Sequence, residues 1–283
     1  MTMKKKKTNH HNTPAPQAKT LLHEKLSFAA TEAYKLLRAN LMFTIPDEQK
    51  CRIVGVTSSI RGEGKSTTAI NLSYTLAETG KRVLLIDCDL RLPSVAKKLG
   101  IEASPGISNL LIGTATEEDA VLKFTDMDTW FILPSGDIPP NPAEMLGSTQ
   151  MAAQIKKFSE QYDYIVVDLP PVNIVSDALV ISPLVDGMIV VIRENYSERR
   201  ALNTCTNQLV LSNVKILGFV MNGATDGNGS YSRYKRYKYY KSSKYYSHKY
   251  YKQYGYYYQG AYEKSKHRRK KKEEPKTENS EHD

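Results

Sequence analysis

A glycine-rich segment, Gly62–Thr67, closely follows an apolar and β-branched run at Arg52–Thr57. The run predicts a buried strand, and the residues after the glycines predict a helix. In that order, the glycines let backbone amides curl around an anion at the positive end of the helix. Lys65 is placed to neutralise the β- and γ-phosphates of a nucleotide, and Ser66 to bind Mg²⁺. Ser59 stands where such loops usually have their first glycine, but the strand, loop and helix still predict a site for ATP and Mg²⁺. The predicted nucleotide-binding residues are Gly62, Glu63, Gly64, Lys65, Ser66 and Thr67.

Strand-like runs recur along the chain at intervals that leave room for helices. Near-continuous apolar runs of this kind are typical of parallel strands that are covered on both faces. We therefore predict an α/β fold with an open, doubly wound, mostly parallel sheet of the P-loop NTPase type. The first helix is predicted to begin near Ser27. The further runs are Val83–Asp87, Trp130–Pro134, Tyr164–Asp168, Met188–Ile192 and Ile216–Met221.

The positive charge of the chain is concentrated at its two ends. The net charge is +10, yet residues 1–25 carry six Lys and one Glu, and residues 229–283 carry sixteen Lys and Arg against six acidic residues. Both ends lack hydrophobic periodicity, which is typical of disordered segments. We predict a flexible basic arm at residues 1–26, a P-loop domain at residues 27–223 and a disordered tyrosine-rich tail at residues 224–283.

Carboxylates stand at the ends of two predicted strands. Asp87 and Asp89 close the strand that begins at Val83, and Asp168 closes a later one. The carboxyl ends of parallel strands line one crevice, so these three side chains are expected to converge near Lys65. Carboxylates there can hold Mg²⁺, directly or through water, and one can accept a proton from an attacking oxygen.

The combined motifs resemble those of the bacterial tyrosine kinases that regulate capsular and exopolysaccharide synthesis. These kinases share a fold with the partitioning and septum-site ATPases. The resemblance covers residues 27–223 and is strongest to the stand-alone cytoplasmic form, which a separate membrane adaptor activates. The residues that carry it are Thr57–Thr67, Asp87-x-Asp89-x-Arg91-x-Pro93, Asp168-Leu169-Pro170-Pro171 and the terminal tyrosine cluster.

The resemblance implies a role for each matching residue. Lys65 would bind phosphate, Ser66, Asp89 and Asp168 would hold Mg²⁺, Asp87 would be the general base, and Arg91 would assist at the phosphates. The implied catalytic residues are therefore Lys65, Asp87, Asp89, Arg91 and Asp168.

Two positions depart from the family pattern. Glu32, Lys35 and Arg38 fall where the family has a Glu-x2-Arg-x2-Arg element that joins neighbouring subunits in a ring. Lysine at the middle position cannot form the bidentate pair that arginine forms. A solvated charged helix face explains the same three residues equally well. The second departure is Arg61, because the family usually has proline just before the glycines; it adds a positive charge near the phosphates.

The tail holds fourteen of the nineteen tyrosines, interleaved with lysines. The resemblance implies that these are phosphoacceptors, modified between subunits, so that enzyme and substrate lie on one chain. Two alternatives stay open. A partitioning-type ATPase could use the tail to bind nucleic acid or another polyanion, since lysine neutralises phosphates and tyrosine stacks on bases; a purely adhesive tail is the other. The predicted acceptors are Tyr231, Tyr234, Tyr237, Tyr239, Tyr240, Tyr245, Tyr246, Tyr250, Tyr251, Tyr254, Tyr256, Tyr257, Tyr258 and Tyr262.

Partners and location are predicted from the same resemblance. No apolar stretch follows Lys4–Lys7, and the longest apolar runs are only as long as a strand, so neither a secretory signal nor a membrane span is predicted. A cytoplasmic protein recruited to the inner face of the membrane is expected. The implied partners are a transmembrane adaptor of the chain-length-regulator type, further copies of the chain, and a cognate tyrosine phosphatase. Nucleic acid is not an expected partner of the kinase.

Overall fold

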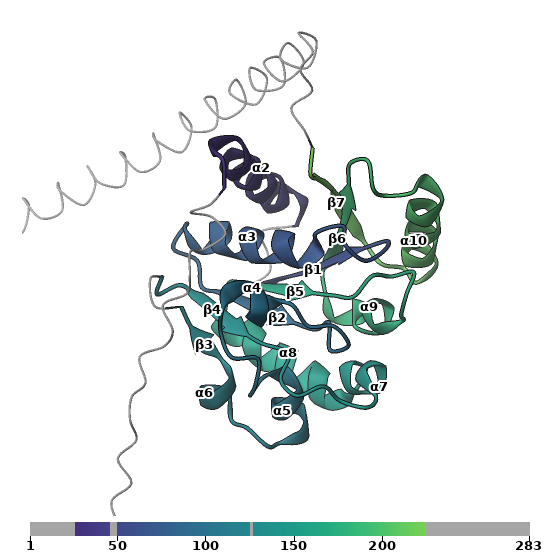
Figure 1. Ribbon diagram of the computed structural model, residues 1–283. Coiled ribbons are helices and arrows are strands. Elements are labelled where there is room, and N and C mark those ends of the chain that lie inside the picture. Colours follow the sequence, from purple (N-terminus) through teal and green to yellow (C-terminus); the bar gives the residue numbers. More distant parts are fainter. Residues whose placement is uncertain (1–25, 46–49, 125–126, 225–283) are drawn as a thin grey trace, which may run out of the picture. The chain divides into compact units, whose positions relative to one another are not determined.

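The sheet at the centre of the protein has seven strands in the order β3-β4-β2-β5-β1-β6-β7. The computed structural model describes residues 26–45, 50–124 and 127–224 (Figure 1). All neighbouring strands pair in parallel except β3 and β4, which are antiparallel. The strands are β1 Arg52–Ser58, β2 Val83–Asp87, β3 Leu122–Lys123, β4 Trp130–Leu133, β5 Tyr164–Asp168, β6 Gly187–Arg193 and β7 Ile216–Asn222.

The predicted fold class and its six predicted strands are confirmed. The edge strand β3 was not predicted, because two residues form too short a run to show a period. The tail and the basic arm lie outside the described residues, apart from Leu26 and Ala224. Among the described residues, no helix is both long enough and apolar enough to cross a bilayer.

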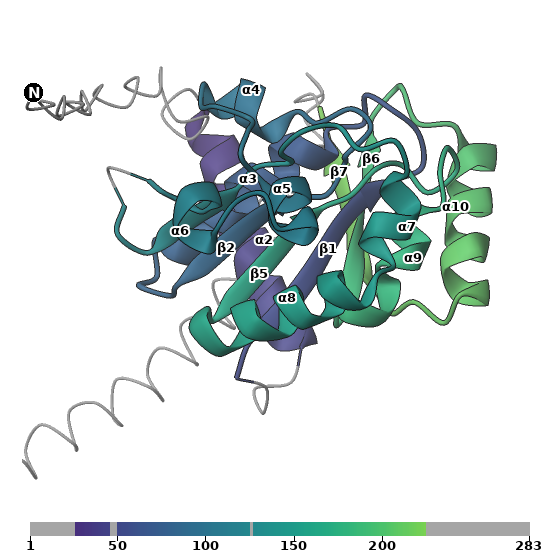
Figure 2. The same cartoon turned by 90° about the horizontal axis from the view of Figure 1, so that it is seen from below.

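Helices cover both faces of the sheet (Figures 1 and 2). Helices α2 and α3 lie on one face, and α7 and α8 lie on the other. Ser27 caps α2, because its hydroxyl accepts a hydrogen bond from the amide of Ala30 at 3.2 Å. The helices are α2 Phe28–Thr44, α3 Lys65–Ala77, α4 Val95–Leu99, α5 Ile107–Ile112, α6 Glu117–Ala120, α7 Pro142–Leu146, α8 Thr149–Gln161, α9 Asp177–Val180, the 3₁₀ turn η1 Ser182–Leu184 and α10 Arg199–Leu211.

Two hydrophobic cores flank the sheet, and alternate strand residues supply them. In β2, Val83 and Leu85 pack into the core under α3, whereas Leu84 and Ile86 pack into the core under α8. This alternation follows from the two-residue period of a strand, and continuous apolar runs result because both faces are buried. The central strands β1, β2 and β5 are therefore rigidly held. Their carboxyl ends form the platform on which the site is built.

Candidate active site

The loop between β1 and α3 requires glycine at two positions. Gly62 and Gly64 have φ angles of 80° and 97°, a region that side chains with a Cβ rarely adopt. Close neighbours are a second reason. A Cβ on Gly64 would lie 1.9 Å from the side-chain nitrogen Nδ2 of Asn222, and a Cβ on Gly62 would lie 2.9 Å from the hydroxyl oxygen of Tyr196. The loop therefore fits tightly against segments from β6 and β7, and α3 begins at Lys65 with its N-terminus facing the cavity.

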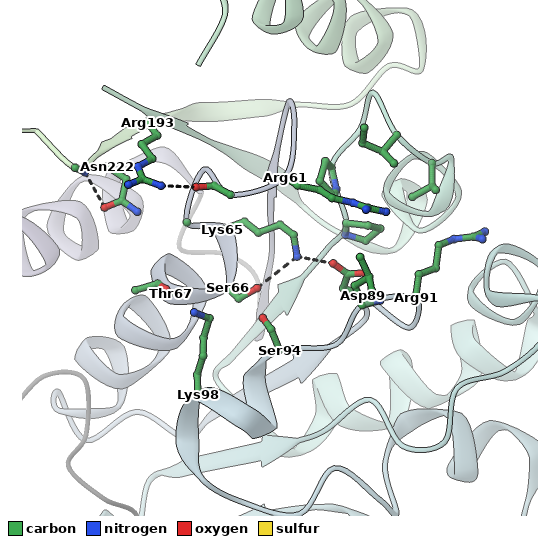
Figure 3. A pocket seen from close by; sticks show the side chains of 18 residues that line it. Arg61, Lys65, Ser66, Thr67, Asp89, Arg91, Ser94, Lys98, Arg193 and Asn222 are labelled. Carbon is green, nitrogen blue, oxygen red and sulfur yellow. Dashed lines mark hydrogen bonds and ion pairs between the residues drawn. The ribbon is translucent and has the colours of Figure 1, made fainter. Parts of the chain in front are cut away.

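A cavity of about 530 Å³ opens at the carboxyl ends of the strands (Figure 3). The predicted nucleotide-binding residues line it, apart from Glu63, together with residues that follow β2, β5, β6 and β7. The most prominent side chains in it are cationic. Its charged side chains are Arg61, Lys65, Asp89, Arg91, Lys98 and Arg193.

Lys65 is paired with two of the predicted carboxylates. Its ammonium lies 2.7 Å from Asp89 Oδ2 and 3.7 Å from Asp168 Oδ1. Burial lowers the pKa of Lys65, but the charges of Asp168 and Asp89 outweigh burial and raise it overall. The predicted convergence of Asp89 and Asp168 on Lys65 is thus observed. Lys65 therefore compensates the negative charge of the two carboxylates.

Asp168 is the most deeply placed of these groups. It is fully buried, and neither of its side-chain oxygens makes a hydrogen bond with any described residue. Burial raises the pKa of Asp168, while Lys65 and the Ser66 hydroxyl oppose that rise. A buried carboxylate with free lone pairs beside a serine hydroxyl is a fitting donor set for Mg²⁺.

No group of three His, Cys, Asp or Glu side chains in the described part of the chain forms a ready metal cluster. This agrees with the way Mg²⁺ binds in nucleotide sites, where one or two carboxylates suffice because phosphates and water complete the shell. Ser66, Asp89 and Asp168 therefore fit the ion without Asp87.

Asp87 has a different environment from its two neighbours. Its Oδ2 accepts hydrogen bonds from the amides of Ser94 and Val95 at 3.1 and 3.0 Å, and its Oδ1 accepts one from the amide of Asp89 at 3.1 Å. It is fully buried and does not line the cavity. Burial, with a smaller contribution from Asp168, raises the pKa of Asp87 to about 7. Asp87 holds the segment after β2 in place, and its role as general base stays a prediction.

Glu63 is turned away from the cavity. Its buried carboxylate accepts hydrogen bonds from the Ser59 hydroxyl at 2.9 and 3.0 Å, from the amide of Ile60 at 2.9 Å, and from the Ser197 hydroxyl. The side chain predicted to bind nucleotide therefore braces the loop from behind. Its contribution to a phosphate would come from its backbone amide.

Arg91 makes a two-point contact that the sequence did not indicate. Its Nε and a terminal nitrogen donate to the two oxygens of Asp177 at 2.8 and 3.0 Å, and Asp177 is buried at the start of α9. Arg91 also lines the cavity. Arg91 joins the segment after β2 to the segment after β5. The predicted role of Arg91 at the phosphates stays a prediction.

Glu32, Lys35 and Arg38 share one face of α2. Lys35 contacts Glu32 at 2.9 Å, as expected for residues three apart in a helix. Arg38 reaches across to α3, where it donates to the carbonyl of Thr75 and lies 3.8 Å from Glu78. The contact between helices was not anticipated. The predicted role of the three residues in joining subunits stays a prediction.

Four residues of the site were missed, and they lie at the ends of β6 and β7 and in the segment after β6. Tyr196 donates to the carbonyl of Arg61 at 3.0 Å, and Arg193 donates to the carbonyl of Gly62 at 3.2 Å. Asn222 donates to the carbonyl of Glu63 at 3.3 Å. Ser197 is the fourth, through its bond to Glu63. The ends of β6 and β7 were predicted, so the rule that strand ends line the crevice could have found Arg193 and Asn222.

Comparison with known proteins gives the same assignment as the geometry. Residues 51–215 match the family model described as AAA domain. The tyrosine-protein kinase YwqD of Bacillus subtilis (strain 168) is 37% identical over 193 residues, which cover 68% of this chain and 81% of that protein. The kinase domain of the Escherichia coli tyrosine kinase ETK superposes with a TM-score of 0.64 at 26% identity, covering 71% of this chain and 79% of that domain.

A more distant structure shows the wider family. The septum site-determining protein MinD of Pyrococcus horikoshii OT3, solved as a complex with Mg-ADP, has a TM-score of 0.52 at 27% identity and covers 62% of this chain and 72% of that chain. The lower TM-score agrees with a shared P-loop core. Because a curated kinase is matched along most of its length, the chain belongs to the bacterial tyrosine-protein kinases, a family within the P-loop ATPases.

Proposed function

We propose that the chain is an ATP- and Mg²⁺-dependent protein tyrosine kinase that phosphorylates the tyrosines of its own tail, between neighbouring copies. The observation that carries this proposal is the pairing of Lys65 with Asp89 and Asp168 in a cavity at the phosphate loop. Lys65 would bind the γ-phosphate and neutralise its charge, and Asp89 and Asp168 would bind the Mg²⁺ that neutralises the rest. Their chemistry suits phosphoryl transfer, which depends mostly on positioning and charge.

The proposed reaction begins when Lys65 releases its carboxylate partners and turns to the β- and γ-phosphates. Ser66, Asp89 and Asp168 would then hold Mg²⁺, which supplies the charge that neutralises the phosphate oxygens. The phenolic oxygen of tyrosine forms a bond to the γ-phosphorus, and the bond from that phosphorus to the bridging oxygen of ADP breaks. The phenolic proton passes to a carboxylate of the site, for which Asp87 is the proposed acceptor. ADP and phosphotyrosine are the products.

The loop amides and the N-terminus of α3 would bind the phosphates throughout. Contacts from Glu63 and Ser197 keep the loop in that shape without any nucleotide. A loop already shaped in this way lowers the ordering cost of binding.

The cellular role that we propose is control of capsular or exopolysaccharide synthesis at the inner face of the membrane. A transmembrane adaptor would recruit and activate the kinase, copies of the chain would assemble, and a phosphatase would reverse the reaction. The resemblance in sequence supports this part. Its test is whether the cytoplasmic segment of a candidate adaptor, added to the purified chain, increases tyrosine phosphorylation.

The test of the enzymatic proposal uses two forms of the chain. A tail-deleted form ending at residue 224 would serve as enzyme, and a full-length Lys65→Met chain as substrate, with ATP and Mg²⁺. We expect phosphotyrosine on the full-length chain by intact mass, in several steps and confined to residues 231–262. Neither form incubated alone should gain mass. Hydrolysis of ATP without any transfer, with adaptor present, would instead favour an ATPase whose tail binds a polyanion, and salt-sensitive RNA binding would then be the next measurement.

A further inference from the structure

Two large aliphatic side chains stand exposed in a cavity whose charged side chains are mostly cationic. Leu92 is 53% exposed and Ile174 is 48% exposed, and both line the cavity that contains Lys65 and Asp89. Phosphates and Mg²⁺ give such side chains nothing to pack against. An aromatic or aliphatic group of a ligand is needed to cover them.

The order of the strands indicates which group that is. The loop after β1 lies between the ends of β5 and β6. The groups proposed to hold the metal, Asp89 and Asp168, follow β2 and β5, so the γ-phosphate end of a nucleotide lies on that side. The base must then extend toward the ends of β6 and β7, where Arg193 and Asn222 line the cavity. Leu92 and Ile174 follow β2 and β5, and so they lie beyond the γ-phosphate, where an in-line acceptor has to arrive.

The segments that carry these two side chains are rigidly held. The amide of Leu92 donates to Asp89 Oδ1 at 3.1 Å, and the amide of Ile174 donates to the carbonyl of Pro171 at 3.1 Å. The two-point contact of Arg91 with buried Asp177 joins one segment to the other. The positions of Leu92 and Ile174 are therefore fixed relative to Asp89, and the exposed side chains are already in place before a ligand binds.

We propose that Leu92 and Ile174 form the docking surface for the aromatic ring of the acceptor tyrosine. The inference rests on the proposed kinase function and names the part of the site that selects the acceptor. A phenol ring has an apolar body and a polar tip, so aliphatic side chains can hold the ring while its hydroxyl points to the γ-phosphate. Serine and threonine have no ring to cover these side chains. The surface therefore favours tyrosine.

The charges that line the cavity do not supply this attraction. The tail is strongly basic, and Arg61, Arg91 and Lys98 are among the cations that line the cavity (Figure 3). Like charges repel, so apolar contact with the ring has to hold a lysine-flanked tyrosine at the cavity. Apolar contact thus explains how a positively charged substrate segment could bind at a cavity lined mostly by positive charges.

The test measures acceptor and nucleotide separately in full-length protein. The acceptor is a synthetic peptide of residues 252–262, and a second peptide has serine at every tyrosine position. In Leu92→Ser and in Ile174→Ser we expect the KM for the tyrosine peptide to rise about tenfold, as loss of one aliphatic contact surface implies. The KM for ATP should stay within about twofold of wild type, and Leu92→Met should restore the KM for the peptide. Leu211→Ser is the matched control, because Leu211 is 83% exposed on α10 and does not line the cavity.

Several results would overturn the proposal. An unchanged KM for the tyrosine peptide in both serine variants would remove the surface from acceptor binding. A parallel rise in the KM for ATP would place the nucleotide base against these side chains instead. A smaller assembly of the serine variants in light scattering would make the surface a contact between copies. A wild-type protein that hydrolyses ATP but labels neither peptide nor tail would reject the proposed function itself, and the acceptor surface with it.

Discussion

The ammonium of Lys65 and the carboxylate of Asp89 form an ion pair at 2.7 Å, and this pair joins the phosphate loop to the segment that follows β2. Asp168 lies on the other side of the same ammonium, at 3.7 Å. The lysine thus neutralises the two carboxylates that we propose as Mg²⁺ ligands. Under that proposal, bound Mg²⁺ would take over this neutralisation from Lys65.

Replacing Lys65 by methionine should destabilise the nucleotide-free fold as well as abolish transfer. Removing one partner from a buried ion pair costs about 3 kcal/mol. The cost should depend on pH. The pKa of Asp87 is raised from 3.8 to about 7 in the fold, so the folded state binds more protons than the unfolded state in that window, and its stability falls as pH rises. The charge of Lys65 lowers the pKa of Asp87, so without Lys65 that pKa would be higher. The stability of Lys65→Met should therefore keep falling to a higher pH than that of the wild type.

The measurement is thermal unfolding with EDTA at about pH 5.5 and about pH 8.5, which lie below and above the raised pKa of Asp87. We expect the deficit of Lys65→Met relative to wild type to be larger at the higher pH. Lys98→Met is the control, because Lys98 is an exposed cation at the same cavity. Equal deficits at both pH values would show that the carboxylates do not depend on Lys65.

Replacing Asp168 by asparagine should remove the effect of Mg²⁺ on nucleotide binding. Asp168 has no hydrogen bond to lose among the described residues, so this change tests its charge. By calorimetry we expect Mg²⁺ to strengthen ATP binding to the wild type by at least about tenfold, which is about 1.4 kcal/mol, and to have little effect on the variant. In EDTA the two proteins should bind ATP similarly. A variant that still responds to Mg²⁺ would place the ion on other ligands.

Replacing Ser197 by alanine should loosen the phosphate loop from behind. The buried carboxylate of Glu63 would lose one of its donors, and a hydrogen bond to a charged group contributes about 1.5–3 kcal/mol. We expect the KM for ATP to rise about fivefold or more, since part of that cost falls on binding. Steady-state ATP hydrolysis measures it. Thr204→Ala is the control, because that hydroxyl bonds only within α10, to the carbonyl of Arg200 at 3.1 Å. An identical KM in the two variants would speak against the bracing role.

Changes on α2 should separate the two readings of its charged face. If the face joins subunits, Lys35→Arg should enlarge the assembly in light scattering, because arginine can form a bidentate pair. Arg38→Gln should lower thermal stability in either case, since it loses the contacts with Thr75 and Glu78, at a cost of about 1 kcal/mol. A Lys35→Arg chain with unchanged assembly, beside an Arg38→Gln chain of lower stability, would leave the face as a helix contact within one copy.

The strands and the phosphate loop could be predicted because their signals are local. Continuous apolar runs such as Leu84–Ile86 occur when both faces of a strand are buried. The phosphate loop needs left-handed φ angles at two positions, and only glycine adopts them readily, so Gly62 and Gly64 mark the loop in the sequence. The short strand β3 gives no such signal. It forms because Leu122 and Lys123 pair with Ile132 and Phe131 of β4.

The chemistry of the individual carboxylates could not be predicted to the same depth. The sequence places Asp87, Asp89 and Asp168 at strand ends and hence in one crevice. Their separate environments depend on contacts from distant segments: Asp87 is held by the amides of Ser94 and Val95, whereas Asp89 pairs with Lys65. The sequence therefore placed three acids at strand ends but did not show that the fold gives each of them a different environment.

The sequence by itself determined the main strands of the sheet, the phosphate loop and the family, because each carries its signal in short runs of residues. The tertiary structure alone decided that Glu63 faces inward to Ser197, that Arg91 binds Asp177, and that Leu92 and Ile174 stand exposed in the cavity that Lys65 also lines. Glu63 and Ser197 are joined across 134 positions, and Arg91 and Asp177 across 86. Contacts of that separation leave no periodic trace in a single sequence, since only the packing of the sheet brings the two partners together.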